Sequence, residues 1–169
     1  MKTSRKKNMP YRRCVGIMLL NREGKVWVGR RVSKWHGDGS AALWQMPQGG
    51  IDNGEKPKFA ALRELEEEVG TANAEVIGKT KDWLKYDLPD EAIGIALKGK
   101  YRGQQQKWFA MRFLGEDSEF NISPDGHQPE FDAWQWVPMN QLVALVVPFK
   151  RDVYEQVVEE FGDFAKQKV

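Results

Sequence analysis

Apolar residues along the chain form short runs that are separated by polar, glycine-containing segments. The runs at 14–20 (CVGIMLL) and 26–31 (VWVGRR) flank the polar stretch NREGK, a pattern that predicts a β-hairpin. Tryptophans alternate with other residues in DAWQWVP, as expected for a strand with one buried face. Together with this segment at 132–138, the same kind of pattern predicts strands at 74–78, 83–88 and 107–114.

Apolar residues spaced three or four positions apart predict helices in three places. The first helix runs from about 58 to 69: Pro57 suits its first turn, and Gly70 is placed to end it. A short helix is predicted at 139–146 and a closing amphipathic helix at 150–164. Strands mixed with helices in this way predict an α/β protein, with a central mixed sheet covered by helices.

The length of 169 residues suits one domain with a substantial core. Its composition is that of an ordinary globular protein, with 41% apolar and 30% charged residues. No internal repeat or linker divides the chain. The basic residues at the start predict a disordered tail at 1–9, followed by one domain at 10–165.

The formal net charge of +2 says little about binding partners. The single cysteine, Cys14, excludes an intramolecular disulfide, and we interpret it as a packed strand residue. No apolar run approaches the ~20 residues of a membrane span. The sequence therefore predicts a cytoplasmic protein with no membrane contact, and it implies no obligate protein partner.

The stretch RELEEEVG concentrates negative charge within one predicted helix. At 100° per residue, Glu64, Glu67 and Glu68 fall on one face and Glu66 lies apart from them. Such a run is most often a solvated acidic face, but this face lacks the basic neighbours that usually accompany it. The glycine-rich loop QGGIDNGEKP also lies directly upstream. Clustered carboxylates with backbone carbonyls suit Mg²⁺ or Mn²⁺, which indicates phosphoryl or pyrophosphoryl chemistry.

The spacing of these residues resembles the Nudix box, G-x5-E-x7-R-E-U-x-E-E-x-G-U, in which U is a bulky apolar residue. The match runs from Gly49 to Thr71, and only Thr71 departs from it, because an aliphatic residue is usual there. The resemblance implies an α/β/α sandwich with a mixed sheet that hydrolyses a nucleoside diphosphate linked to another group. Such motif matches need structural context, which the predicted strand, loop and helix supply.

The resemblance also implies roles for individual residues. The metal ligands would be Glu64, Glu67 and Glu68, with the Gly49 carbonyl as an addition, and Glu68 and Glu64 are the candidates for the catalytic base. Glu130, in the segment PEF, could join the metal cluster from a loop, although its spacing alone favours an exposed loop acid. Structural roles within the motif fall to Glu55 and Arg63, whose equivalents in the family usually pair to hold the loop against the helix, and to Gly70.

Other segments resemble one branch of this family, which contains bacterial RNA pyrophosphohydrolases and asymmetric dinucleoside tetraphosphate hydrolases. In that branch, positions matching Arg12, Arg31 and Lys150 contact phosphates, and those matching Tyr86 and Phe149 contact bases. Without the family, solvated charges and core aromatics are the simpler interpretation. The segments that carry the resemblance are WQMPQGGI (44–51), WLKYDLP (83–89), QKWF (106–109), PEFDAWQWV (129–137) and PFKRDVY (148–154).

Three functions are open at this point. The first is removal of pyrophosphate from 5′-triphosphorylated RNA, and the second is hydrolysis of diadenosine tetraphosphate to ATP and AMP. The third is a non-catalytic RNA- or cation-binding scaffold, against which the intact set of glutamates argues. The loop at 32–43 receives no role, and His36 and His127 are interpreted as loop histidines.

Overall fold

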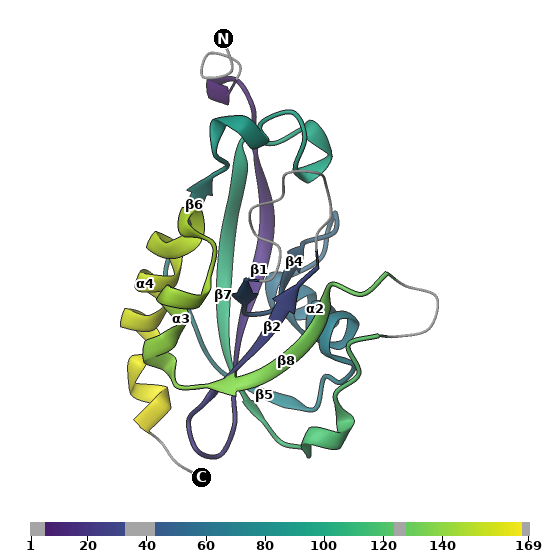
Figure 1. Cartoon of the computed structure of the whole chain (residues 1–169), viewed down its shortest axis with the longest axis vertical. Helices are drawn as coiled ribbons and strands as arrows, with labels where there is room; N and C mark the ends of the chain where they lie inside the picture. Colours follow the sequence, from purple (N-terminus) through teal and green to yellow (C-terminus); the bar gives the residue numbers. More distant parts are fainter. Residues whose placement is uncertain (1–5, 33–42, 124–127, 167–169) are drawn as a thin grey trace.

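Two long strands, β1 (Tyr11–Leu20) and β7 (Gly103–Phe113), run parallel to each other through the centre of the molecule (Figure 1). The computed structural model describes residues 6–32, 43–123 and 128–166. In this part of the chain eight strands form one mixed sheet, with β3-β2-β1-β7-β5 as its main order. In addition β4 pairs with β1, β6 with β7, and β8 with β2.

The remaining strands are short and mostly follow the sequence prediction. The predicted hairpin is present, with Leu20 opposite Val26, but beyond that point β1 pairs with β4 and β2 with β8. The sequence predicted no strand at β3, and the segment of β4 was expected to be part of the glycine-rich loop. The bounds of the strands around the central pair are β2 (Val26–Arg31), β3 (Trp44–Gln45), β4 (Gln48–Gly50), β5 (Ala74–Lys79), β6 (Leu84–Asp87) and β8 (Phe131–Val137).

Helices cover both faces of this sheet (Figure 1). On one face α2 (Pro57–Val69) buries Leu65 and Val69 in a cluster with Ile17 of β1 and Phe109 of β7. The other face is covered by α3 (Leu142–Leu145) and α4 (Arg151–Phe161). These layers confirm the α/β/α sandwich that the Nudix resemblance implies.

The helix bounds are close to those predicted. At the end of α2, Gly70 has a φ of 90° and its N–H donates to the Glu66 carbonyl at 2.9 Å, so a glycine is favoured there. The expected 139–146 helix is a 3₁₀ turn followed by α3, and the expected 150–164 helix is α4 followed by another 3₁₀ turn. The 3₁₀ segments are Asp90–Ala92, Leu97–Gly99, Asp117–Glu119, Met139–Gln141, Pro148–Lys150 and Gly162–Lys166.

Two other predictions have clear outcomes in the strands and the box. Cys14 is fully buried in β1, as expected, and burial raises the pKa of its thiol to about 11. Thr71, the departure from the Nudix box, donates a hydrogen bond from its hydroxyl to Glu119 Oε1 at 3.2 Å. A polar contact therefore replaces the usual aliphatic packing at this position.

Residues of the segment expected to be a disordered tail, 1–9, contact the domain where the structure describes them. The Lys6 ammonium donates to the Leu88 carbonyl at 2.8 Å and lies 3.9 Å from Asp87 and 3.7 Å from Asp90, and Met9 packs against the core. Residues 1–5 lie outside the described residues, as do 33–42 with His36, and 124–127 with His127. Along the described segments, no helix is both long and apolar enough to cross a bilayer.

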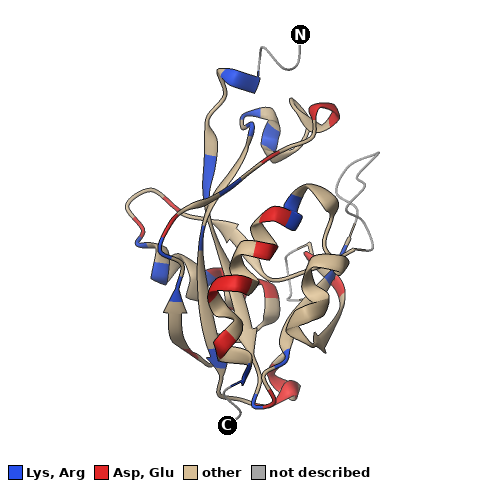
Figure 2. Cartoon of the chain, turned by 90° about the vertical axis from the view of Figure 1, so that its left-hand side faces the viewer, with Lys and Arg blue, Asp and Glu red and all other residues tan. Residues whose placement is uncertain are grey.

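Charge is unevenly distributed over the molecule. In Figure 2, where α4 faces the viewer, acidic residues follow that helix and basic residues predominate at the end of the molecule near the N-terminus. Exposed acids of α4 include Asp152, Glu155 and Glu159. A basic end raises the local concentration of anionic ligands and speeds their association.

Candidate active site

The loop before α2 and the helix itself meet at Gly49 and Glu64. The side chain of Glu64 is only 13% exposed because it lies against the backbone of β4. A Cβ atom at position 49 would overlap the Glu64 carboxyl group. The backbone of Gly49 does not have a positive φ, so the close approach of the carboxyl group is what requires glycine here.

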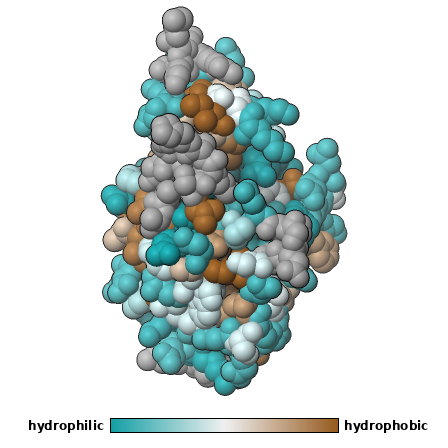
Figure 3. All heavy atoms as spheres, turned by 45° about the vertical axis from the view of Figure 1, so that its right-hand side comes forward, coloured by the Kyte–Doolittle hydropathy of each residue, from teal (hydrophilic) through white to brown (hydrophobic). Residues whose placement is uncertain are grey.

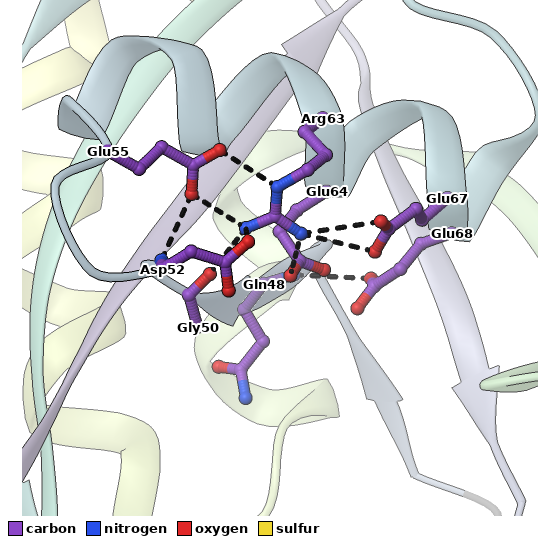
Figure 4. A network of polar contacts seen from close by, with 8 residues as sticks. All are labelled: Gln48, Gly50, Asp52, Glu55, Arg63, Glu64, Glu67 and Glu68. Carbon is purple, nitrogen blue, oxygen red and sulfur yellow. Dashed lines mark hydrogen bonds and ion pairs between the residues drawn. The ribbon is translucent and has the colours of Figure 1, made fainter.

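Arg63 connects the loop to the helix (Figure 4). Its Nε donates to Glu55 Oε2 at 2.9 Å, and its Nη2 donates to Glu55 Oε1 and to the Gly50 carbonyl, both at 2.8 Å. The structure therefore contains the expected contact between Glu55 and Arg63. Hydrogen bonds from the guanidinium lower the pKa of Glu55 to about 2.

The expectation that the acidic face lacks basic partners is wrong. Arg63 Nη1 lies 2.9 Å from Glu64 Oε1 and 3.3 Å from Glu67 Oε1 (Figure 4). The guanidinium that binds Glu55 in the loop therefore also contacts two acids of the helix. Arg63 and Glu67 are four residues apart, a spacing that brings side chains together on a helix, so the sequence did contain the signal for this contact. The charge repulsion within the helix is thus partly neutralised by the protein itself.

The three acids have different environments. Burial, followed by the nearby Glu67, raises the pKa of Glu64 to about 7, and the Arg63 guanidinium opposes this shift. Glu68 accepts the backbone N–H of Gln48 at 3.2 Å. The side chain of Glu67 is 57% exposed. The prediction that all three form one exposed patch is therefore wrong for Glu64.

A cavity of about 920 Å³ opens beside these acids. Glu64, Glu68 and Glu130 line it, together with Gly49, whereas Glu67 lines a neighbouring hollow that also contains Glu66. Among the described residues, no three carboxylate, imidazole or thiol side chains lie close enough together to hold a metal ion as they stand. The acids do fit a hard divalent cation chemically, because the cavity offers carboxylate oxygens and a glycine backbone where no side chain could be placed.

All five residues that were predicted to bind substrate line the same cavity. They come from β1, β2, β6 and the turn before α4, and they are Arg12, Arg31, Tyr86, Phe149 and Lys150. Arg31 Nε is buried and has no hydrogen-bond partner in the described part of the chain. On the face of the molecule seen in Figure 3, small hydrophobic patches are set among hydrophilic atoms.

Tyr86 and Lys150 are more deeply buried than an open aromatic platform and a surface charge would be. Tyr86 is 7% exposed and belongs to the core beneath α4, and its ring centroid lies 5.6 Å from that of the half-buried Phe149. Lys150 is 3% exposed, and its ammonium donates to Gln45 Oε1 at 3.0 Å. Burial, and next the Arg31 charge, lower the pKa of Lys150 to about 7.

Sequence reasoning missed part of the cavity wall. The connection between β6 and β7 contributes residues from Leu88 to Tyr101, including the half-exposed Ile95. Gln48 and Gln104 also line the cavity. The signal for Gln104 was available in the sequence, since glutamines at 104 and 106 place two amides on one face of a strand whose next same-facing residue is Trp108.

An α/β/α sandwich with a glycine, an arginine and several glutamates in this arrangement defines a hydrolase of the Nudix class. A NUDIX domain profile matches residues 10–157, and the chain belongs to the Nudix family. Nudix hydrolases generally need divalent metal ions. The family assignment therefore agrees with the oxygen-rich wall of the cavity.

Several bacterial relatives are similar to the chain over nearly their whole length. The chain is 56% identical over 163 residues to the RNA pyrophosphohydrolase of Agrobacterium fabrum, covering 94% of this chain and 96% of that protein. It is 54% identical over 163 residues to the RNA pyrophosphohydrolase of Rhizobium meliloti, with coverage of 94% and 98%.

Solved structures of distant relatives share the fold. The MutT protein of Methanosarcina mazei has a TM-score of 0.64 at 18% identity, covering 90% of this chain and 96% of that one. The Escherichia coli dihydroneopterin triphosphate pyrophosphohydrolase has a TM-score of 0.62 at 19% identity, covering 89% and 99%. At such low identity these similarities show the fold alone.

Proposed function

We propose that the protein removes pyrophosphate from the 5′-triphosphate end of RNA and leaves a 5′-monophosphate. The observation that carries this proposal is a cavity lined by both glutamates and basic residues. An aromatic pair lies beside the basic residues. The sequence identity of 56% to an RNA pyrophosphohydrolase over nearly the whole chain supports RNA as the substrate.

The basic residues that line the cavity suit a triphosphate. Arg12, Arg31 and Lys150 line the cavity, and planar guanidinium groups bind phosphate oxygens well. Arg31 Nε has no hydrogen-bond partner in the described residues, so a phosphate oxygen would satisfy it. A bound phosphate would also favour the protonated form of Lys150, which burial disfavours in the free protein.

The glutamates at the cavity suit a hydrolytic step with Mg²⁺ or Mn²⁺. The residues that would hold the cation are Glu64, Glu67, Glu68 and Glu130, with the Gly49 carbonyl. A divalent cation there would neutralise charge on the pyrophosphate and acidify water. The Glu67 carboxylate would share its oxygens between the Arg63 guanidinium and the cation. Glu64 and Glu68 both line the cavity, and either carboxylate could accept the proton of the attacking water.

The aromatic pair suits the nucleotide portion. Phe149 is half-buried and offers more open surface than Tyr86, so we assign the larger stacking contribution to Phe149. The β6–β7 connection supplies a further wall of the same cavity. A substrate that continues past its first nucleotides can follow this wall. Because RNA is made inside the cell, we expect the protein to work in the cytoplasm.

The test is a comparison of two substrates on the purified protein. Triphosphorylated RNA and diadenosine tetraphosphate are each incubated with Mg²⁺ or Mn²⁺, and the initial rates and products are measured. We expect faster hydrolysis of the RNA, with pyrophosphate released and a 5′-monophosphate left. Faster hydrolysis of diadenosine tetraphosphate, giving ATP and AMP, would contradict the proposal. Glu68→Gln should abolish the reaction, and Glu66→Gln serves as its matched control.

A further inference from the structure

A chain of hydrogen bonds leads from a buried tryptophan to the floor of the cavity. Trp108 Nε1 lies 3.0 Å from Gln106 Oε1. Gln106 Nε2 in turn donates to Gln104 Oε1 at 2.7 Å and to Gln48 Oε1 at 2.9 Å. Gln104 and Gln106 are 2% and 1% exposed, so their amides form few hydrogen bonds to bulk water.

The direction of every bond in this chain follows from the tryptophan. An indole N–H can only donate, so the Gln106 atom that faces it must be the oxygen. The NH₂ group of Gln106 then faces the other two side chains, which must both present their oxygens. The NH₂ groups of Gln48 and Gln104 are therefore left over as donors, whatever amide orientation is assigned at first.

Packing holds the indole of Trp108 in place, so the chain cannot easily reverse. Trp108 is fully buried, its backbone N–H donates to Thr80 Oγ1 at 3.1 Å, and its ring meets Tyr154 edge-on with centroids 5.7 Å apart. A Cβ atom at Gly16, on the neighbouring strand, would overlap the indole. The absence of a side chain at Gly16 thus makes room for the ring.

The leftover donors lie where substrate is expected. Both glutamines line the cavity. In the sheet, Gln104 stands directly between Arg12 on β1 and Tyr86 on β6. This places its NH₂ group between a residue proposed to bind phosphate and one proposed to contact a base.

The amide of Gln45 is oriented in the same way, by a partner that can only donate. The Lys150 ammonium can only donate, so the Gln45 atom it contacts at 3.0 Å must be oxygen. Gln45 Nε2 is buried and lacks a hydrogen-bond partner within the described residues. Donor-only partners thus fix the direction of amides in two places, and in both the amide oxygen is already used.

We propose that Trp108 and Gln106 are positioning residues that fix the Gln48 and Gln104 amides as a pair of neutral donors to the phosphate oxygens of the substrate. The cavity floor then accepts only groups that present hydrogen-bond acceptors. Neutral donors add direction without charge, so they release no counterions when phosphate binds. The inference rests on the proposed function only for the identity of the substrate, because any polyphosphate could use these donors.

The experiment measures binding of inorganic tripolyphosphate to the full chain, without divalent cation, over a series of salt concentrations. Gln104→Met removes the donor and should weaken binding about three- to tenfold, the ordinary worth of one neutral hydrogen bond. The dependence of affinity on salt should stay the same. Lys150→Met should weaken binding as well, but should also reduce that salt dependence by about one unit.

Trp108→Phe tests the positioning role, because it keeps a buried ring and removes only the N–H that sets the direction. Its affinity should also fall, and Gln104→Met added to it should cost less than Gln104→Met costs alone. Hydrolysis by Trp108→Phe should show a higher KM with kcat nearly unchanged. The matched control is Trp27→Phe, since Trp27 is fully buried on the other side of the sheet and its N–H has no hydrogen-bond partner among the described residues.

The outcomes separate this inference from the proposed function. Parent-like affinity for tripolyphosphate in both Gln104→Met and Trp108→Phe would overturn the inference, even if the parent hydrolyses triphosphorylated RNA. A parent that binds no tripolyphosphate would overturn it too. If the variants weaken binding but the parent does not hydrolyse triphosphorylated RNA, the inference about the glutamine donors is supported and the proposed RNA substrate is wrong. Should Trp108→Phe fail to fold, Gln104→Met still tests the donor, and Gln106→Met, which removes the amide between Trp108 and Gln104, tests the positioning role in its place.

Discussion

Replacing Gly49 by alanine tests how closely the active site depends on the approach of β4 to α2. The backbone at Gly49 is not in a positive-φ conformation, so alanine adds no backbone strain. The added methyl group would overlap the Glu64 carboxyl group. Since Arg63 holds this carboxylate at 2.9 Å, the substitution must either displace Glu64 or separate the strand from the helix.

The size of the effect follows from the overlap. Non-bonded carbon atoms pack at about 3.5–4.0 Å, so the Glu64 carboxyl carbon would have to move by more than about 1 Å. A misplacement of about 1 Å in a catalytic constellation costs on the order of 10²-fold in rate. We therefore expect Gly49→Ala to lower kcat/KM by about 100-fold while the protein stays folded.

The assay is steady-state hydrolysis of the best substrate at saturating divalent cation, with thermal unfolding measured in parallel. Gly54→Ala is the matched control, because Gly54 lies in the loop between β4 and α2, has a φ of 78° and has open space where an added Cβ would lie. Alanine there should cost about 1 kcal/mol of stability through backbone strain, with kcat/KM nearly unchanged. The two variants thus separate loss of stability from displacement of a carboxylate.

A double-mutant cycle decides whether Gly49→Ala acts through Glu64. When Glu64 is already replaced by glutamine, adding Gly49→Ala should cost much less than it does in the parent, because the catalytic carboxylate is no longer there to be misplaced. Full additivity of the two losses, or a Gly49→Ala protein as active as the parent, would refute the reasoning.

Three further predictions concern single side chains. Glu68→Gln should lower kcat by about 10²-fold or more, whereas Glu66→Gln, whose side chain does not line the large cavity, should be nearly silent; an equal loss in both would refute the geometric argument. The pKa of Glu55 is lowered to about 2 from an ordinary 4.5, so its stabilising effect is present above the unfolded-state pKa and is lost as the pH falls from about 4.5 to 2. The difference in unfolding free energy between the parent and Glu55→Gln should therefore shrink over that range in acid titrations followed by circular dichroism, and a constant difference would show that the pair contributes nothing. Phe149→Leu should weaken RNA binding with an unchanged salt dependence, whereas Lys150→Met should reduce that dependence by roughly one unit per lost phosphate contact; parent-like RNA affinity in Phe149→Leu would assign the ring to the core.

The sequence alone determined the features that depend on local spacing. The bounds of α2, its end at Gly70 and most strands follow from periodicity and from residues that suit helix ends, and these act over a few positions. The contact between Glu55 and Arg63, which lie eight residues apart, was expected from the resemblance to the Nudix box. The five residues predicted to bind substrate all line the cavity, and they came from the family resemblance, which is a linear pattern; the wall between Leu88 and Tyr101 was not predicted.

Only the tertiary structure decided how these residues meet. Lys150 and Gln45 are 105 residues apart in the chain, and no spacing rule predicts that one buries its charge against the other. The strands β3 and β4 were missed because each is two or three residues long and exists only through pairing with β2 and β1.

The direction of the cavity amides is likewise a property of the fold. It is set by Trp108, which reaches Gln106 only because both side chains lie on the same buried face of β7 and Gly16 leaves space for the ring. Residue types and local periods thus identified what chemistry is present. Packing between distant segments determined which groups are buried, which are already paired and which remain available to a substrate, because burial and hydrogen-bond partners depend on contacts that the linear sequence does not contain.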